Sequence, residues 1–366
     1  MEENKQEKYK DPFRATLTGI MDLFKKQVAV GTISDTDRLD GKTVVVDGAS
    51  SGLGFAIAVE VAKRGAKTIM ACRSGIPAKG EEVKKLSGNQ DVHMLKVDFS
   101  DAVSIEKLVS ELKEKFSPID ILICNAGVVP NKARKTPQGF EEMFMVNYFS
   151  KFLYVTALIE NGSFGRIGFE ARAVRPKAGD APTTVISKNT DKEALPANPG
   201  IVSENKGAAI PRIIFVSSES HRNPAAIKWD DFGKFTPYGI KQSMEHYGQN
   251  KLLLTTFAVE LSRRLNTNGH TAASVFALCP GPVNSNIARE TPKVFQPLLK
   301  VVFRLFFKSP KDAAAPVIYF SVSKDVEGKA FDYLFLMNRK DVDFKAMDPA
   351  NGLKLWEMSS ALRKNL

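Results

Sequence analysis

The sequence predicts an α/β fold in which a doubly wound parallel sheet carries helices on both faces. From Gly41 onward, short β-branched segments alternate with segments of helical periodicity. That alternation is typical of parallel strands joined by right-handed helical crossovers. A glycine-rich turn at residues 48–54 lies where the first strand would lead into the first helix. The 366 residues suffice for one large domain of this class with additions.

The expected elements follow in chain order. Each strand is a short apolar run, and each helix has apolar residues at helical spacing. Strands are expected at residues 43–46, 67–72, 92–97, 119–124, 212–216 and 271–278, with helices at 55–64, around 104–115, and between the last two strands. Residues 41–345 would form the single domain, preceded by an extension at 1–40 and followed by a C-terminal helix at 346–366.

Two segments depart from the alternation. Apolar residues in the extension share one helical face, which predicts an amphipathic helix that packs on the domain or a partner, or else lies on a membrane surface. These residues are Phe13, Leu17, Ile20, Met21 and Phe24. Between the helix ending near Glu160 and the strand at 212–216 lie about fifty residues, where a compact crossover needs only a handful. Apolar and polar residues alternate there with a period of two, so 161–210 is expected to be an inserted β-hairpin and polar loop.

Composition excludes several classes. The net charge is +11, but no basic stripe with interleaved aromatic residues indicates nucleic-acid binding. Cys72, Cys124 and Cys279 are widely spaced, which favours reduced, buried thiols in a reducing compartment and gives no metal-ligand pattern. No secretory signal and no run of 18 apolar residues is present, so a cytoplasmic protein is expected, with peripheral membrane contact as an alternative.

The glycine-rich turn predicts a dinucleotide site of the Rossmann type. Glycines between a strand and a helix let backbone N–H groups approach a pyrophosphate at the helix N-terminus. The turn comprises Gly48, Ser50, Ser51, Gly52, Leu53 and Gly54. Arg73 follows the second strand, where an NAD site usually offers an acid to the ribose; an arginine there suits a 2′-phosphate and favours NADPH over NADH. Asp98 and Phe99, after the third strand, would lie at the adenine edge.

A tyrosine and a lysine one helical turn apart indicate acid–base chemistry. Tyr247 and Lys251 occupy one helix face in YGQNK, downstream of the pair Ser217–Ser218. The ammonium is expected to favour phenolate and lower the pKa of Tyr247. The order of nucleotide turn, Asn-Ala-Gly strand end, serine strand end and Tyr/Lys helix predicts a nicotinamide-dependent oxidoreductase.

These stretches resemble the short-chain dehydrogenase/reductase family, in particular its retinol-dehydrogenase-like and protochlorophyllide-reductase-like branches. The matching segments are DGASSGLG, MACRS, VDFSD, LICNAGV, MFMVNYFSKF, RIIFVSSESH, YGQNK, CPGPVNS and NGLKLWEMSSAL. The resemblance implies that Ser218 orients a carbonyl, Tyr247 is the proton donor, Lys251 holds the nicotinamide ribose, and Asn147 anchors a relay water. It also places two groups beside the cofactor: Asn125, Ala126 and Gly127, and Pro280, Gly281, Val283 and Ser285.

One position departs from the family pattern. Asp47 precedes the glycine turn where the family carries threonine. Its carboxylate could accept the same hydrogen bond from the Asn-Ala-Gly strand end. It would also put a negative charge near a pyrophosphate, which is expected to weaken cofactor binding.

The substrate is expected to be apolar. Apolar residues interleaved with Lys and Arg occupy 286–310, where the family places its substrate-closing lid; the alternative is a dimer interface or a core helix. The leading function is hydride transfer between NADPH and a carbonyl or alcohol of a lipid-, retinoid- or steroid-like compound. The alternatives are C=C reduction of a tetrapyrrole and a non-catalytic nucleotide-binding or scaffold protein whose Asp47 has spoiled the site.

Overall fold

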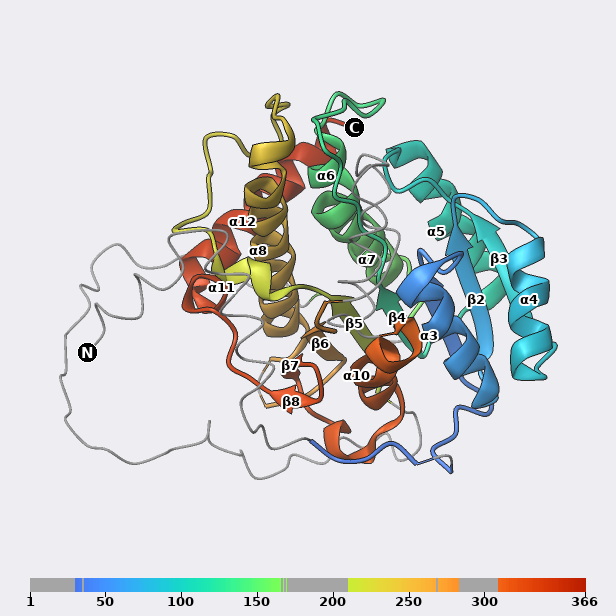
Figure 1. Ribbon diagram of the computed structural model, residues 1–366. Helices are drawn as coiled ribbons and strands as arrows, with labels where there is room; N and C mark the ends of the chain where they lie inside the picture. Colours follow the sequence, from blue (N-terminus) through green and yellow to red (C-terminus); the bar gives the residue numbers. More distant parts are fainter. Residues whose placement is uncertain are drawn as a thin grey trace, which may run out of the picture.

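The sheet has eight strands, and seven of them run parallel. The computed structural model describes residues 30–34, 36–165, 167, 169, 210–267, 269–282 and 309–366. The strand order is β3-β2-β1-β4-β5-β6-β7-β8, and only the β7–β8 pairing is antiparallel (Figure 1). The strands are β1 (Thr43–Asp47), β2 (Lys67–Cys72), β3 (Val92–Lys96), β4 (Ile121–Cys124), β5 (Arg212–Val216), β6 (Ser274–Cys279), β7 (Phe331–Phe335) and β8 (Asn338–Arg339).

Helices cover both faces of the sheet, so the predicted three-layer α/β architecture is confirmed in the described part of the chain (Figure 1). One face packs against α3 (Gly52–Lys63), α4 (Ala78–Ser87) and α10 (Pro310–Val322). The other packs against α5 (Ala102–Phe116), α7 (Ser150–Glu160) and α8 (Ile240–Leu265). The remaining helices are α6 (Glu142–Phe144), the π-helix η2 (Met145–Phe149), η3 (Glu219–Arg222), η6 (Lys324–Val326), α11 (Phe344–Met347) and α12 (Pro349–Lys364).

The central strands are apolar without interruption because both of their faces are buried. In β1, Val44 and Val46 point into the core beneath α3 and α10, whereas Val45 points into the core beneath α5, α7 and α8. All three side chains are inaccessible to solvent. The period of two in a strand therefore divides one valine run between two cores.

The strands predicted at 67–72 and 212–216 have the expected bounds, and two others start later than predicted. β4 begins at Ile121 rather than at 119, because the N–H of Ile119 donates to the carbonyl of Ser163 outside the sheet. β6 begins at Ser274 rather than at 271, because the N–H groups of Ala272 and Ala273 both donate to Asn266. In both cases a local acceptor competes with the neighbouring strand for backbone donors.

Several predicted segments lie wholly or largely outside the described residues. These are the amphipathic helix in 1–40, the hairpin and loop in 161–210 and the lid at 286–310, together with Val283 and Ser285. At the start of the insertion, Ile167 and Phe169 pack against the core, and the ring centroid of Phe169 lies 5.2 Å from that of Trp356. In the part of the chain that the structure covers, no helix combines the length and the apolar character needed to cross a bilayer.

The predicted C-terminal helix is present as α11 and α12, and α12 packs along α8 (Figure 1). The guanidinium of Arg264 stacks 4.1 Å from the ring centroid of Trp356. The same indole meets Phe152 of α7 edge-on, with centroids 5.3 Å apart. A Cβ at Gly352 would lie 2.7 Å from the carboxylate of Glu260, so the missing side chain lets the two helices approach. The last helix therefore belongs to the core of the domain.

We predict that Leu355→Ala lowers the free energy of unfolding by about 2–5 kcal/mol, since it removes a side chain that is 1% exposed and leaves a cavity between α12 and the domain. Leu353→Ala, on the same helix but 41% exposed, is the matched control and should change it by less than about 0.5 kcal/mol. Urea denaturation measures both. Equal effects would show that α12 does not pack as described.

Candidate active site

The carboxyl ends of the parallel strands form one edge, and the predicted site residues gather along it. β1 ends at Asp47, β4 at Cys124, β5 at Val216 and β6 at Cys279. The chain reverses its winding between β1 and β4, which are adjacent in the sheet but not in sequence. Ligands of open α/β sheets bind in the crevice at such a switch point.

The glycine turn has the shape required to hold a pyrophosphate. Gly48 and Gly52 have positive φ angles of 63° and 57°, which favour glycine. A Cβ at Gly48 would lie 2.9 Å from the Cα of Ala126, and one at Gly54 would overlap the carbonyl of Gly48. Ser51 precedes α3 without a side-chain cap, so the N–H groups of the first turn are not capped by it. These features fit a dinucleotide cofactor.

Asp47 ties this turn to the neighbouring strand end, as expected for the residue in the threonine position. Its Oδ1 accepts the N–H of Asn125 at 2.6 Å and also the N–H of Ala126. The structure adds a cation that the sequence analysis did not identify, and the expected weakening of cofactor binding stays a prediction. Oδ2 lies 2.7 Å from Nζ of Lys151, and both side chains are buried. The carboxylate is therefore half of an ion pair.

The Asn-Ala-Gly strand end and Asn147 are held together by reciprocal hydrogen bonds. Oδ1 of Asn147 accepts the N–H of Val128 at 2.7 Å, and its Nδ2 donates to the carbonyl of Val128 at 2.9 Å. A Cβ at Gly127 would lie 3.3 Å from Oδ1 of Asn147. Asn147 belongs to the π-helix η2, a distortion frequent at functional sites. Its role with a relay water stays a prediction.

Ser218 is the second residue after β5, and the ring of His221 binds its backbone carbonyl. His221 is fully buried, and its Nδ1 lies 2.6 Å from the carbonyl of Ser218. Because a carbonyl only accepts, Nδ1 must carry the proton, and Nε2 then accepts the N–H of Asp343 at 3.3 Å. Burial, with the nearby Arg222 guanidinium, lowers the pKa of His221 to about 4. A neutral imidazole therefore fixes the serine loop at neutral pH.

Tyr247 and Lys251 lie together on α8, facing Ser218. Ser218 lies close enough to the phenol of Tyr247 to lower its pKa, and the Ser218 hydroxyl donates to that of Ser220 at 3.2 Å. Nζ of Lys251 lies 5.6 Å from the tyrosine ring centroid and donates to the carbonyl of Val216 at 2.8 Å. The structure thus brings Ser218, Tyr247 and Lys251 together as the sequence predicts.

The expected lowering of the tyrosine pKa is not found. Burial raises the pKa of Tyr247 above its usual value, Cys279 adds to the rise, and only the Ser218 hydrogen bond opposes it. The ammonium of Lys251 lies against the ring and binds a backbone carbonyl, so its stabilisation of phenolate is outweighed by desolvation. Burial and the charge of Lys151 also lower the pKa of Lys251, to about 8.

The residues assigned to the adenosine half of a cofactor divide into two groups. Arg73 follows β2 and is 63% exposed, with Nη1 3.9 Å from Oδ2 of Asp98, so its guanidinium can reach a ligand at this edge. Phe99 and Leu53 are buried in the core, and their side chains therefore do not line the site. At these two positions a bound cofactor would meet the backbone, and their assignment to the cofactor site stays a prediction.

Near the nicotinamide end, Pro280 and Gly281 follow β6 as predicted. Gly281 has a φ of 78°, and a Cβ there would lie 2.5 Å from Leu336, so the bend requires a glycine.

Cys72, Cys124 and Cys279 are buried free thiols at the ends of β2, β4 and β6. Burial raises the pKa of Cys72 and of Cys279 to about 11, which keeps these two protonated.

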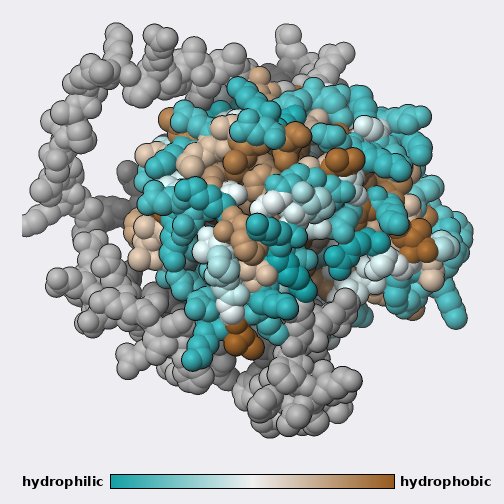
Figure 2. All heavy atoms as spheres, turned by 90° about the horizontal axis from the view of Figure 1, so that it is seen from above, coloured by the Kyte–Doolittle hydropathy of each residue, from teal (hydrophilic) through white to brown (hydrophobic). Residues whose placement is uncertain are grey.

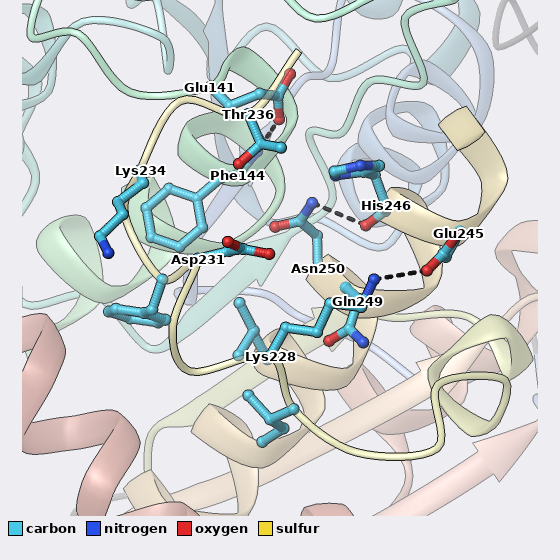
Figure 3. Close-up of a pocket in the computed structure, with 13 residues that line it drawn as sticks. Glu141, Phe144, Lys228, Asp231, Lys234, Thr236, Glu245, His246, Gln249 and Asn250 are labelled. Atoms are coloured by element: carbon cyan, nitrogen blue, oxygen red, sulfur yellow. Dashed lines mark hydrogen bonds and ion pairs between the residues drawn. The ribbon is translucent and has the colours of Figure 1, made fainter. Parts of the chain in front are cut away.

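A separate hollow lies on another face of α8 (Figure 3). His246, Gln249, Asn250 and Leu253 line it, together with the loop after Ile227 and the start of α6. Ser218, Tyr247 and Lys251 are not among the residues that line it. Several of its polar groups are bonded within the protein, including Glu245 to Lys228 at 2.7 Å and Asn250 to the carbonyl of His246 at 2.9 Å. The hollow is therefore distinct from the crevice.

Sequence reasoning missed two residues that support the site, Lys151 and His221. Lys151 stands in the otherwise apolar run YFSKFLYV, and a lysine within a buried helix needs a partner. That pattern could have indicated an ion pair, though not which acid completes it. His221 follows Ser218 by three residues, the spacing of a single helical turn, in SSESH.

Comparison with known proteins identifies the family. The sequence profile of the short chain dehydrogenase family matches residues 42–168. Human retinol dehydrogenase 13 is 30% identical over 357 residues, which cover 95% of this chain and 92% of the relative. The chain belongs to the short-chain dehydrogenase/reductase family. Mouse retinol dehydrogenase 12 is also 30% identical, over 92% of this chain and 91% of its own length.

Solved structures share this fold. An uncharacterized protein from Mycobacterium paratuberculosis superposes with a TM-score of 0.62 at 24% identity, covering 92% of this chain and 98% of its own. Pseudomonas aeruginosa RhlG, solved as a complex with NADP, gives a TM-score of 0.55 at 18% identity, covering 83% and 98%. As a family member with a glycine turn that fits a dinucleotide, the protein is an NAD(P)-dependent oxidoreductase.

We predict an acid-sensitive contribution of His221 to stability. The lowered pKa means that the folded state binds fewer protons than the unfolded state between about pH 6.5 and about pH 4. The contribution is complete above about pH 6.5 and disappears as the pH falls to about 4, a loss of about 3 kcal/mol. The midpoint of thermal unfolding, plotted against pH, should fall less steeply at acid pH for His221→Gln than for the parent. His93→Gln, at an exposed histidine, should keep the parental slope; the same slope for both variants would contradict the assignment.

Proposed function

We propose that the protein is an NADPH-dependent oxidoreductase that transfers hydride between the nicotinamide and a carbonyl or alcohol of an apolar substrate, with Tyr247 as acid and base. One observation carries the proposal. The Ser218 hydroxyl and the Tyr247 phenol interact beside the edge formed by the carboxyl ends of the strands, with Nζ of Lys251 5.6 Å from the tyrosine ring centroid. Two donors converging on one point suit an oxygen that gains negative charge.

The chain's own residues would handle the oxygen and its proton. The nicotinamide, when bound, supplies the hydride and, once oxidised, a positive charge. Ser218 donates to the substrate oxygen and orients it, while Tyr247 donates a second hydrogen bond and then transfers its proton. Lys251, with a pKa of about 8, is mainly protonated at neutral pH, so a cation stabilises the phenolate that remains.

Arg73 supports NADPH as the preferred cofactor. It directly follows β2, is well exposed, and its ion pair within the described part of the chain is a long contact with Asp98. A guanidinium at this place can form charge-assisted bonds with a 2′-phosphate. Its positive charge would also neutralise the charge of the 2′-phosphate, which an acidic residue at this position would repel.

The surface beside Tyr247 supports an apolar substrate. Ile240 and Met244 precede Tyr247 by seven and three residues, so the three lie on one face of α8. Ile240 is 61% and Met244 48% exposed. Figure 2, which shows the molecule from above, also has hydrophobic residues among hydrophilic ones on its surface. The relatives named retinol dehydrogenases make a retinoid-like compound a plausible choice within this class.

In the alternative of a non-catalytic scaffold, the charge of Asp47 spoils cofactor binding. Lys151 compensates that charge, and Ser218, Tyr247 and Lys251 are assembled beside the crevice. These contacts favour catalysis over a purely structural use of the fold.

We predict that Tyr247→Phe abolishes NADPH oxidation with a panel of apolar aldehydes and ketones that includes retinal. NADPH binding should stay within about threefold of the parent, because only the proton-transferring hydroxyl is lost. Tyr319→Phe is the matched control. It should remain active, because the hydroxyl that it removes lies on α10 and is bonded to Asp325. Substantial residual turnover by Tyr247→Phe would contradict its assignment as acid and base.

Arg73→Asp is expected to weaken NADPH binding by about tenfold or more and to leave NADH nearly unchanged, since the lost contact is to the 2′-phosphate. Fluorescence titration with both nucleotides measures the difference. Arg38→Asp makes the same charge change at an exposed arginine before β1, at the opposite edge of the sheet, and should affect neither. A parallel loss of both affinities would leave the NADPH preference without support.

A further inference from the structure

We propose that Asp47 and Lys151 act as one positioning pair of the nucleotide site. In this pair the carboxylate holds the Asn125–Ala126 strand end against the glycine turn, and the ammonium cancels the carboxylate's charge beneath the bound phosphates. The inference rests on the proposed binding of NADPH, which supplies the anion. It assigns Lys151 a role in cofactor binding that its place in an apolar helix does not suggest.

The two carboxylate oxygens of Asp47 have different partners. Oδ1 takes the N–H groups of Asn125 and Ala126, and Oδ2 takes the ammonium of Lys151. Nδ2 of Asn125 donates to the carbonyl of Asp47 at 3.0 Å, which closes the link between β1 and β4. A threonine has a single side-chain oxygen. It could make the strand link, but it offers no second oxygen and no negative charge to pair with Lys151.

Burial makes the two charges depend on each other. The Asp47 side chain is 0% and the Lys151 side chain 1% exposed, and removing either partner would leave a buried, unpaired charge. Nζ of Lys151 also lies 4.0 Å from the ring centroid of Phe99, so an aromatic face covers the ammonium. Lys151 follows Asn147 by four residues in the same run of helix.

Titratable groups from every surrounding element face the pair. They are Cys72 of β2, Cys124 of β4, Tyr154 of α7 and Lys251 of α8, each of which interacts electrostatically with Asp47. The thiols of Cys72 and Cys124 and the phenol of Tyr154 all have raised pKa values and stay neutral. The neighbouring charge is therefore that of Lys251, which Lys151 repels and Asp47 attracts.

Lys151→Met tests the pair directly, because it leaves the Asp47 carboxylate without its cation. A buried, unpaired carboxylate favours its protonated form, so the variant should carry the extra negative charge at high pH and lose it at low pH. Between about pH 6 and about pH 8, the dissociation constant of NADPH for Lys151→Met should rise about tenfold more than that of the parent. Fluorescence titration measures the dissociation constants.

Two further variants separate charge from packing. Asp47→Thr combined with Lys151→Met removes both charges and keeps a hydroxyl acceptor for the strand end, so its affinity should lie within about threefold of the parent and show no added pH dependence. Lys151→Arg keeps the cation and should resemble the parent. Arg264→Met breaks the ion pair with Glu260 in the distant half of α8 and should leave NADPH affinity unchanged at both pH values.

The outcomes are distinguishable. A pH-independent loss in Lys151→Met, or a double variant as weak as the single one, would show that Lys151 acts through packing and overturn the proposal. So would parental affinity in Lys151→Met. If the parent itself does not bind NADPH, the proposed function fails instead, and thermal unfolding still tests the pair. The midpoint of Lys151→Met should then fall relative to the double variant as the pH rises from about 6 to about 8, because the unpaired carboxylate is charged there.

Discussion

Seven parallel strands bring their carboxyl ends to one edge of the sheet, and every residue of the site depends on that alignment. The edge collects residues separated by more than two hundred positions, from Asp47 to Gly281. The reversal of winding between β1 and β4 leaves room there for a ligand. Helix α8 then supplies Tyr247 and Lys251 from the layer above the same edge.

Charge is concentrated beneath this edge to an unusual degree for a buried region. Lys151, Lys251 and Asp47 are all withdrawn from solvent, and their charges sum to one positive unit. That sum suits an anionic cofactor, whereas a lone Asp47 would have made the balance neutral. The cost of burying Asp47 is offset by three donors, two of them backbone groups that the sheet holds in place.

The sequence predicted local features well, but it did not predict which residues far apart in the chain are partners. The spacing of Tyr247 and Lys251 fixes their common helix face, and the apolar runs fix the central strands, because both depend on neighbouring residues only. The partner of Asp47 lies 104 positions away, and nothing in either segment indicates the pairing. The lowered pKa of Tyr247 was predicted wrongly because spacing gives proximity, whereas the pKa also depends on burial and on which acceptor Nζ of Lys251 binds.

The packing of α12 along α8 has a consequence for how the protein forms during synthesis. α8 carries Tyr247 and Lys251 near its start and contacts Trp356 and Leu355 of a helix almost one hundred residues later. The nucleotide-binding strands β1 to β4 have all been synthesised long before that helix leaves the ribosome, but a domain generally folds as a unit. The helix that carries the tyrosine therefore reaches its final packing only after residues 349–364 have been made.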